Sequence, residues 1–173
     1  MSLEDARRAL IERQGSGARY DAPGAPAADL VMARRWSAQL ARLLNDTPDA
    51  DLFRDRGAAP SLAGHIAEVS LQARRMSELI AAVRADAPLP GLLPVAGEVD
   101  HAAHLPARAL RHLFDHTRVH LNVEWREMSD ADWTRVVTCG DGTRLAVADL
   151  PRRRSEALQA ASSEFRRTGH RAI

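Results

Sequence analysis

Apolar residues recur every three or four positions through four long stretches of the chain. This spacing places them on one face of an α-helix, so each stretch is predicted to be helical. The expected helices cover residues 28–44, 61–84, 106–128 and 151–167. Pro106 stands where a first helical residue tolerates proline, and Ser61 is an expected helix cap. The inward side of the second helix is predicted to hold Leu62, Ile66, Val69, Ala73, Met76, Ile80 and Val83.

The connections between these helices differ in length and composition. Residues 49–60 are predicted to be a loop anchored by Leu52 and Phe53, and residues 86–105 a long excursion rich in proline and glycine. Ser129 with Asp132 predicts a cap and a turn, with Trp133 packing back. Residues 136–148 are compatible with a short β-hairpin that turns at Gly140-Asp141-Gly142.

Four long helices with one long crossover loop predict an all-α, antiparallel four-helix bundle. Residues 1–27 are expected to be an N-terminal extension, helical over 2–14 and a Gly/Pro/Ala linker over 15–27, and residues 28–173 the bundle domain. In such bundles, sites are built from inward side chains on facing helices. Functional side chains are therefore expected on the inner faces of the helices.

Composition narrows the range of partners. The net charge is +1 over 173 residues, so neither nucleic acid nor an anionic membrane is predicted as a partner. No run is apolar enough to cross a bilayer, and the N-terminus has no apolar signal core. The single cysteine, Cys139, fits a reducing cytoplasm and is expected to be a surface thiol in a turn. A homodimer is left open.

Histidines and arginines supply the candidate chemistry. His112, His116, His120 and Glu124 recur every four residues, a row that drifts around the helix, so all four cannot ligate one ion. Of these, His120 and Glu124 fall at the edge of the buried face. The other histidines of this region, and the arginines that open the last helix, are expected to be solvated. They are His101, His104, His112, His116, Arg152, Arg153 and Arg154.

His65 differs from these because it lies inside an apolar stripe. A buried polar group is costly unless it has a partner or a task. Two interpretations stay open for His65: a core histidine with one hydrogen-bonded nitrogen, or a functional residue. Histidine suits the second role because its ordinary pKa is close to neutral.

Several segments resemble the N-terminal domain of maleylpyruvate isomerases, a branch of the DinB-like four-helix-bundle superfamily. They are ALIERQGSGARYDAP, LVMARRWSAQLARLLNDTPDADL, LPARALRHLFDHTRVHLNVEWREMSDADW and DGTRLAVADLP, and the resemblance runs from about Asp5 to Pro151. It implies a divalent metal, usually zinc, held by a histidine of the second helix and a Glu-x-x-x-His pair of the fourth. It also implies a low-molecular-weight thiol as cofactor, activated by the metal as a thiolate.

Carried over residue by residue, only part of that metal site is found. His65, in LAGHIAEV, matches the ligand of the second helix. An ungapped alignment of LAVADLP places Ala157 and Ala161 where the glutamate and histidine are expected. A one-residue shift offers Glu156, which would face solvent. Because the ligand pair of the fourth helix is missing, the three-ligand site is predicted to be incomplete. The C-terminal domain of the isomerases also has no counterpart in this sequence.

Two functions from different classes follow. One is a divergent enzyme that acts on a small molecule in a cavity around His65, with His120 and Glu124 as further catalytic candidates or weak metal ligands. The other is a non-catalytic ligand-binding or assembly module that kept the bundle and lost the metal. The largest apolar pocket is predicted to border His65, Ala157, Ala161 and at least one of His120 and Glu124, with Trp125 or Met76 as a wall.

Overall fold

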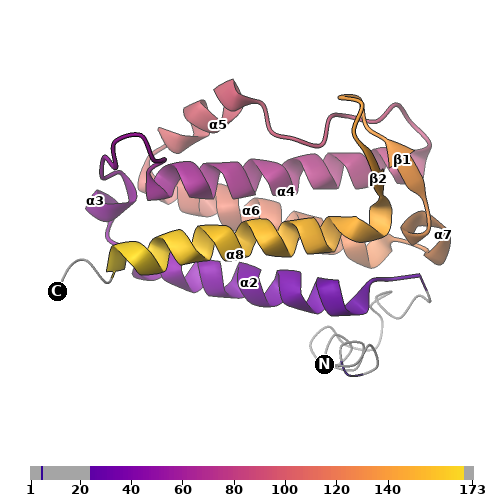
Figure 1. Ribbon diagram of the computed structural model, residues 1–173, viewed down its shortest axis with the longest axis horizontal. Helices are drawn as coiled ribbons and strands as arrows, with labels where there is room; N and C mark the ends of the chain where they lie inside the picture. Colours follow the sequence, from indigo (N-terminus) through magenta and orange to yellow (C-terminus); the bar gives the residue numbers. More distant parts are fainter. Residues whose placement is uncertain (1–4, 6–23, 170–173) are drawn as a thin grey trace.

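Four long helices form the bundle that the sequence predicts; the first and fourth run in one direction, and the second and third run in the other (Figure 1). The computed structural model describes Asp5 and residues 24–169, so most of the predicted extension over 1–27 lies outside the described residues. Helix α2 packs against α8 and α6, and α4 packs against α6 and α8. The prediction of an all-α bundle is confirmed, and the predicted ends lie within two residues of the observed ones. The four helices are α2 (Ala27–Asp46), α4 (Leu62–Ala85), α6 (Ala107–Glu127) and α8 (Leu150–Gly169).

Helix α4 begins and faces the core as its sequence predicts. The Ser61 hydroxyl accepts a hydrogen bond from the Gly64 N–H at 3.0 Å, which satisfies one of the unpaired donors of the first turn. All seven residues of its predicted inward stripe are buried. Burying an aliphatic side chain of this size contributes roughly 1.5–3 kcal/mol, so this stripe is a main source of the helix's stability.

The apolar core has two halves along the same four helices. One half, near the hairpin, includes Trp125 and Trp133, and the other, near the far end of the bundle, includes Phe114 and Leu158. The stretches of α2, α6 and α8 that separate the two halves carry buried polar side chains. These are Ser37, Thr117, Arg154 and Ser155. Polar side chains of these three helices therefore lie between the two apolar halves of the core.

Two short helices interrupt the segments predicted to be loops. Helix α3 (Asp49–Leu52) buries Leu52 completely, as expected, but Phe53 is 41% exposed, so its predicted role as an anchor is wrong. Helix α5 (Ala96–Ala103) lies within the crossover and packs on α4 (Figure 1). Proline and glycine around it had predicted an irregular excursion. The two-turn helix was missed because its apolar pattern is too short to be distinguished from a loop.

The predicted hairpin is present and fixes the crossover loop. Strands β1 (Val136–Thr138) and β2 (Arg144–Ala146) pair antiparallel, with Val137 opposite Leu145. Gly140 donates its N–H to the Pro90 carbonyl at 3.0 Å, and a Cβ at this glycine would meet the Leu89 carbonyl oxygen at 2.7 Å. The Asp141 carboxylate accepts the Leu92 N–H at 3.1 Å. The hairpin therefore fixes the position of residues 89–92 in the crossover loop. The residues that follow them in the loop lie over α4.

The segments on either side of β1 give one confirmation and one correction. Ser129 and Asp132 form the predicted capping box that opens α7 (Asp130–Trp133), and Trp133 is buried. After β2, the short 3₁₀ helix η2 (Val147–Asp149) leads into α8. Cys139 is buried, so the prediction of a surface thiol is wrong: its neighbours in the turn are polar, but its own side chain faces the core. Among the described residues, no helix is long and apolar enough to cross a membrane.

Candidate functional site

His65 opens onto a cavity of about 160 Å³ in the groove between α4 and α8. Leu93 and Pro94, which follow the segment fixed by the hairpin, cover it. As predicted, His65, Ala157 and Ala161 border one cavity, although it is not the largest. The complete lining is His65, Glu68, Val69, Gln72, Leu93, Pro94, Ala157, Ala160 and Ala161.

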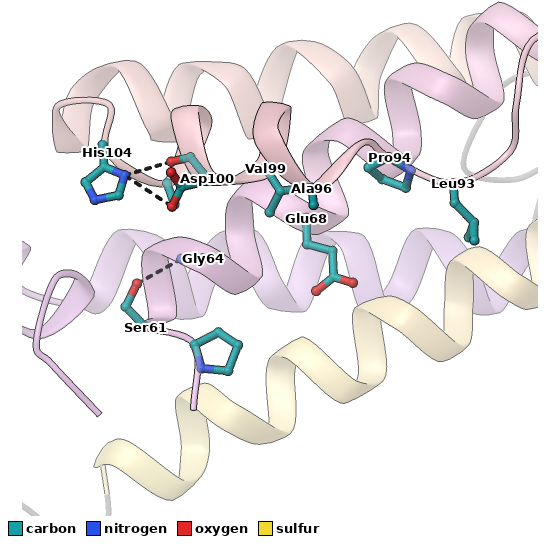
Figure 2. Close-up of a pocket in the computed structure, with 11 residues that line it drawn as sticks. Ser61, Gly64, Glu68, Leu93, Pro94, Ala96, Val99, Asp100 and His104 are labelled. Atoms are coloured by element: carbon teal, nitrogen blue, oxygen red, sulfur yellow. Dashed lines mark hydrogen bonds and ion pairs between the residues drawn. The ribbon is translucent and has the colours of Figure 1, made fainter. Parts of the chain in front are cut away.

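A larger cavity of about 580 Å³ adjoins the first one (Figure 2). The two share Glu68, Leu93 and Pro94 in their walls, so they form neighbouring parts of one hollow over α4. Apolar residues of the crossover and α5, such as Ala96 and Val99, dominate the larger part. A hollow with apolar walls and few polar groups suits a small organic ligand.

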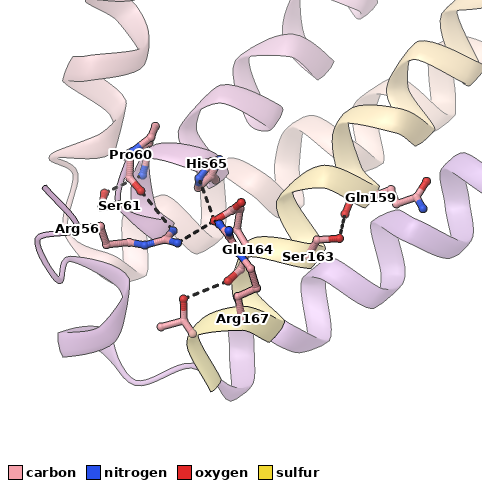
Figure 3. Close-up of polar contacts among 10 residues, drawn as sticks. Arg56, Pro60, Ser61, His65, Gln159, Ser163, Glu164 and Arg167 are labelled. Carbon is pink, nitrogen blue, oxygen red and sulfur yellow. Dashed lines mark hydrogen bonds and ion pairs between the residues drawn. The ribbon is translucent and has the colours of Figure 1, made fainter. Parts of the chain in front are cut away.

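The imidazole of His65 lies beside a carboxylate that is already paired (Figure 3). His65 Nε2 is 4.0 Å from Glu164 Oε2, too far for a hydrogen bond, and it is buried without a hydrogen-bond partner among the described residues. Arg56 donates to the same oxygen at 2.7 Å, and Arg167 also contacts it. These two guanidinium groups pair with Glu164, and His65 Nε2 stays without a hydrogen bond from the described residues.

Burial and charge act on His65 in opposite directions. Burial lowers the pKa of His65, because the charged imidazolium loses its hydration, while Glu164 raises it. The net direction of the pKa is downward, because the loss of hydration outweighs the attraction of Glu164 and because Arg56 and Arg167 add to the lowering. Their hydrogen bonds hold the pKa of Glu164 down at about 2. His65 is therefore neutral at neutral pH and can accept a proton. Arg56 and Glu164 could not be singled out from the sequence, because their charges resemble those of any solvated face.

His120 and Glu124 lie elsewhere, so their predicted convergence with His65 is wrong. They contact each other at 3.3 Å along α6, and Glu124 also pairs with Arg84 of α4 at 3.4 Å. They line a separate cavity of about 400 Å³ against α4. Its α4 wall includes Ser77, about 120° around the helix from His65 at 100° per residue. The other four histidines of this region are exposed, as predicted.

Arg154 is the clearest departure from the sequence-based expectations. Instead of being solvated, it is 2% exposed and lies between α8 and α4. It donates to the Val69 carbonyl oxygen and to Gln72 Oε1. The three consecutive arginines look alike in the sequence. Only the phase of the helix, which the buried Leu150 and Leu158 define, decides which of the three faces inward.

Comparison with solved structures identifies the architecture. The chain superposes on the crystal structure of a mycothiol-dependent maleylpyruvate isomerase with a TM-score of 0.73, and on that of a variant with one histidine replaced by alanine with a TM-score of 0.74. The chain has the maleylpyruvate isomerase fold. Sequence identity is 21% in both cases, over 84% of this chain and 62% of the other. No protein-family profile matches the sequence, and no curated protein does.

The zinc that the maleylpyruvate isomerase resemblance implies does not fit the residues at the corresponding positions. Ala157 and Ala161 face the same cavity as His65, which supports the ungapped alignment, but neither side chain has a lone pair. Glu156 is exposed and pairs with Arg152 at 3.4 Å. In the described part of the chain, His, Cys, Asp and Glu do not gather in groups of three suited to a metal ion. That zinc binds weakly or not at all at these positions stays a prediction.

Proposed function

We propose that the protein is a thiol-dependent small-molecule enzyme of the isomerase or transferase type, with its reaction centred on His65. The observation that carries this proposal is the buried, unpartnered Nε2 of a neutral histidine in the wall of a cavity. A histidine held in this state is suited to general-base catalysis. The fold neighbour is described as mycothiol-dependent, which supports a thiol as the second reactant.

The surroundings of His65 support a role in proton transfer that does not require a bound metal ion. His65 Nε2 would take the proton of the thiol S–H, and the thiol would supply the sulfur nucleophile for an electron-poor carbon of the substrate. Glu164, 4.0 Å away, would stabilise the imidazolium so formed. The same Nε2–H would return the proton when the reaction is completed. Leu93 and Pro94 would limit the access of water to this step.

The larger adjoining cavity suits the body of the thiol or of the substrate. Its volume of about 580 Å³ falls within the range of small-molecule sites, whereas the 160 Å³ beside His65 accommodates only a reacting group. The same observation favours the alternative function, a ligand-binding module. A mostly apolar hollow can retain a ligand without any chemistry.

Turnover measurements separate these functions. Purified protein would be assayed with a low-molecular-weight thiol, such as mycothiol or glutathione, and electron-poor unsaturated acids. His65→Gln should lower kcat/KM by about 10²-fold or more, the range for loss of a general base. His101→Gln, an exposed change on α5, should leave it unchanged. Thiol binding without thiol-dependent turnover in the unsubstituted protein would favour the binding module instead.

A further inference from the structure

Among the residues that the structure describes, Arg154 is a buried cation without an anionic partner. Its guanidinium Nη1 donates to two neutral oxygens, the Val69 carbonyl and Gln72 Oε1, the latter at 3.1 Å. Its Nη2 is buried and has no hydrogen-bond partner within the described residues. Burial lowers the pKa of Arg154 to about 9, so it still carries its charge at neutral pH. A buried charge without a counter-ion strongly destabilises a protein, so a functional reason for its presence is expected.

The position of Arg154 connects it to the His65 cavity. Val69 and Gln72, which accept its hydrogen bonds, both line that cavity, and so does Ala157, one turn after Arg154 on α8. The guanidinium therefore lies directly behind the cavity wall, with the half-buried Gln72 between them. A guanidinium has donors only, so the Gln72 amide must present its oxygen to Arg154. Its NH₂ group is then left to donate on its other side.

We propose that Gln72 and Arg154 form the binding site for a carboxylate group of the small molecule that enters the His65 cavity. Gln72 donates to the carboxylate, and Arg154 behind it supplies the positive charge. A small, planar, singly charged group matches this arrangement, since the cavity holds about 160 Å³ and the Glu68 carboxylate in its wall opposes a larger charge. The inference rests on the proposed function only in using the same cavity.

The sharpest test is Gln72→Glu, which changes a neutral amide into a carboxylate of nearly the same shape. The new carboxylate would pair with Arg154 and would repel the ligand's carboxylate instead of donating a hydrogen bond to it. We expect this variant to bind propionate at least tenfold more weakly than the unsubstituted protein does, by calorimetry or NMR titration, and to have a higher Tm. Gln159→Glu adds the same charge at an exposed position of α8 and should change neither property.

Arg154→Met gives an independent test, because it removes the charge and keeps a long apolar side chain. Replacing a buried charge with an apolar group of similar size is often neutral or stabilising. We expect a folded protein of equal or higher Tm that binds propionate at least tenfold more weakly. Arg152→Met, on the exposed side of the same helix, should bind propionate as the unsubstituted protein does.

Three outcomes would overturn this inference. They are equal binding of propionate and its neutral amide, binding of inorganic phosphate as tightly as propionate, and undiminished propionate binding by Gln72→Glu. A lowered Tm in Gln72→Glu would also contradict the inference that the charge of Arg154 lacks a counter-ion. These results are distinct from failure of the proposed function, because propionate binding requires neither thiol nor turnover. An inactive protein that binds propionate through Gln72 would still confirm the carboxylate site.

Discussion

Restoring two donor residues should create a zinc site at His65. Ala157 and Ala161 are one helical turn apart on α8 and line the same cavity as His65. The double variant Ala157→Glu/Ala161→His would therefore supply, with His65, the three protein ligands of an open zinc site. The 160 Å³ of free space gives the longer side chains room to enter the groove between the helices.

The expected size of the effect follows from linkage. If the variant binds zinc with a Kd near 1 μM, then 100 μM free zinc stabilises the folded state by about 2.7 kcal/mol. For a domain of this size, about 1 kcal/mol shifts the Tm by roughly 2–4 °C, so zinc should raise the Tm by about 5–10 °C. Thermal unfolding with and without zinc measures this, and cobalt absorption reports the coordination geometry.

The matched control adds His65→Ala to the double variant, which leaves two ligands and should abolish most of the zinc-dependent shift. The reasoning is refuted if the folded double variant shows no zinc-dependent shift, or if the shift persists without His65. Either result would mean that Ala157 and Ala161 do not face His65 closely enough to share an ion.

Three further predictions concern stability and the second cavity. The pKa of Glu164 is depressed, so the stability it contributes is present above pH 4.5 and is lost as the pH falls towards 2; Glu164→Gln should remove about 1 kcal/mol of this acid-dependent stability in urea unfolding at pH 2–7. Phe114→Ala should cost about 3–5 kcal/mol in the same assay, because this ring is fully buried, and a loss below about 1 kcal/mol would contradict the described core. Glu124→Gln should leave ligand binding at His65 unchanged, because Glu124 lines the other cavity; a tenfold loss in a binding titration would show that the two cavities act together.

The fold could be predicted because its signals are local and repeated. In α4, seven apolar residues at helical spacing all turned out to be buried, and Ser61 caps the helix as its position suggests. In α6, Pro106 and the run from Leu110 to Trp125 placed both ends within a residue or two. Helix α5 was missed, because eight residues give too few turns for a periodicity to emerge.

The site was only half predictable, because it depends on which faces meet. Helix phase placed His65 and Ala161 correctly on one cavity. The phase of α6 put His120 at the edge of its buried face, but it does not say which neighbouring groove that edge borders. Arg154 shows the same limit, because three consecutive arginines carry no signal for which one is buried. Such pairings are set by tertiary packing.

The proposed function requires a thiol or its substrate to bind beside His65. An NMR titration of the histidine ring signals with mycothiol or glutathione tests it most directly, because His65 and His120 report on two separate cavities. We predict saturable changes in the ring signals of His65, with those of His120 unchanged. Saturable changes confined to His120, or no change at His65 at thiol concentrations that support turnover, would contradict the claim.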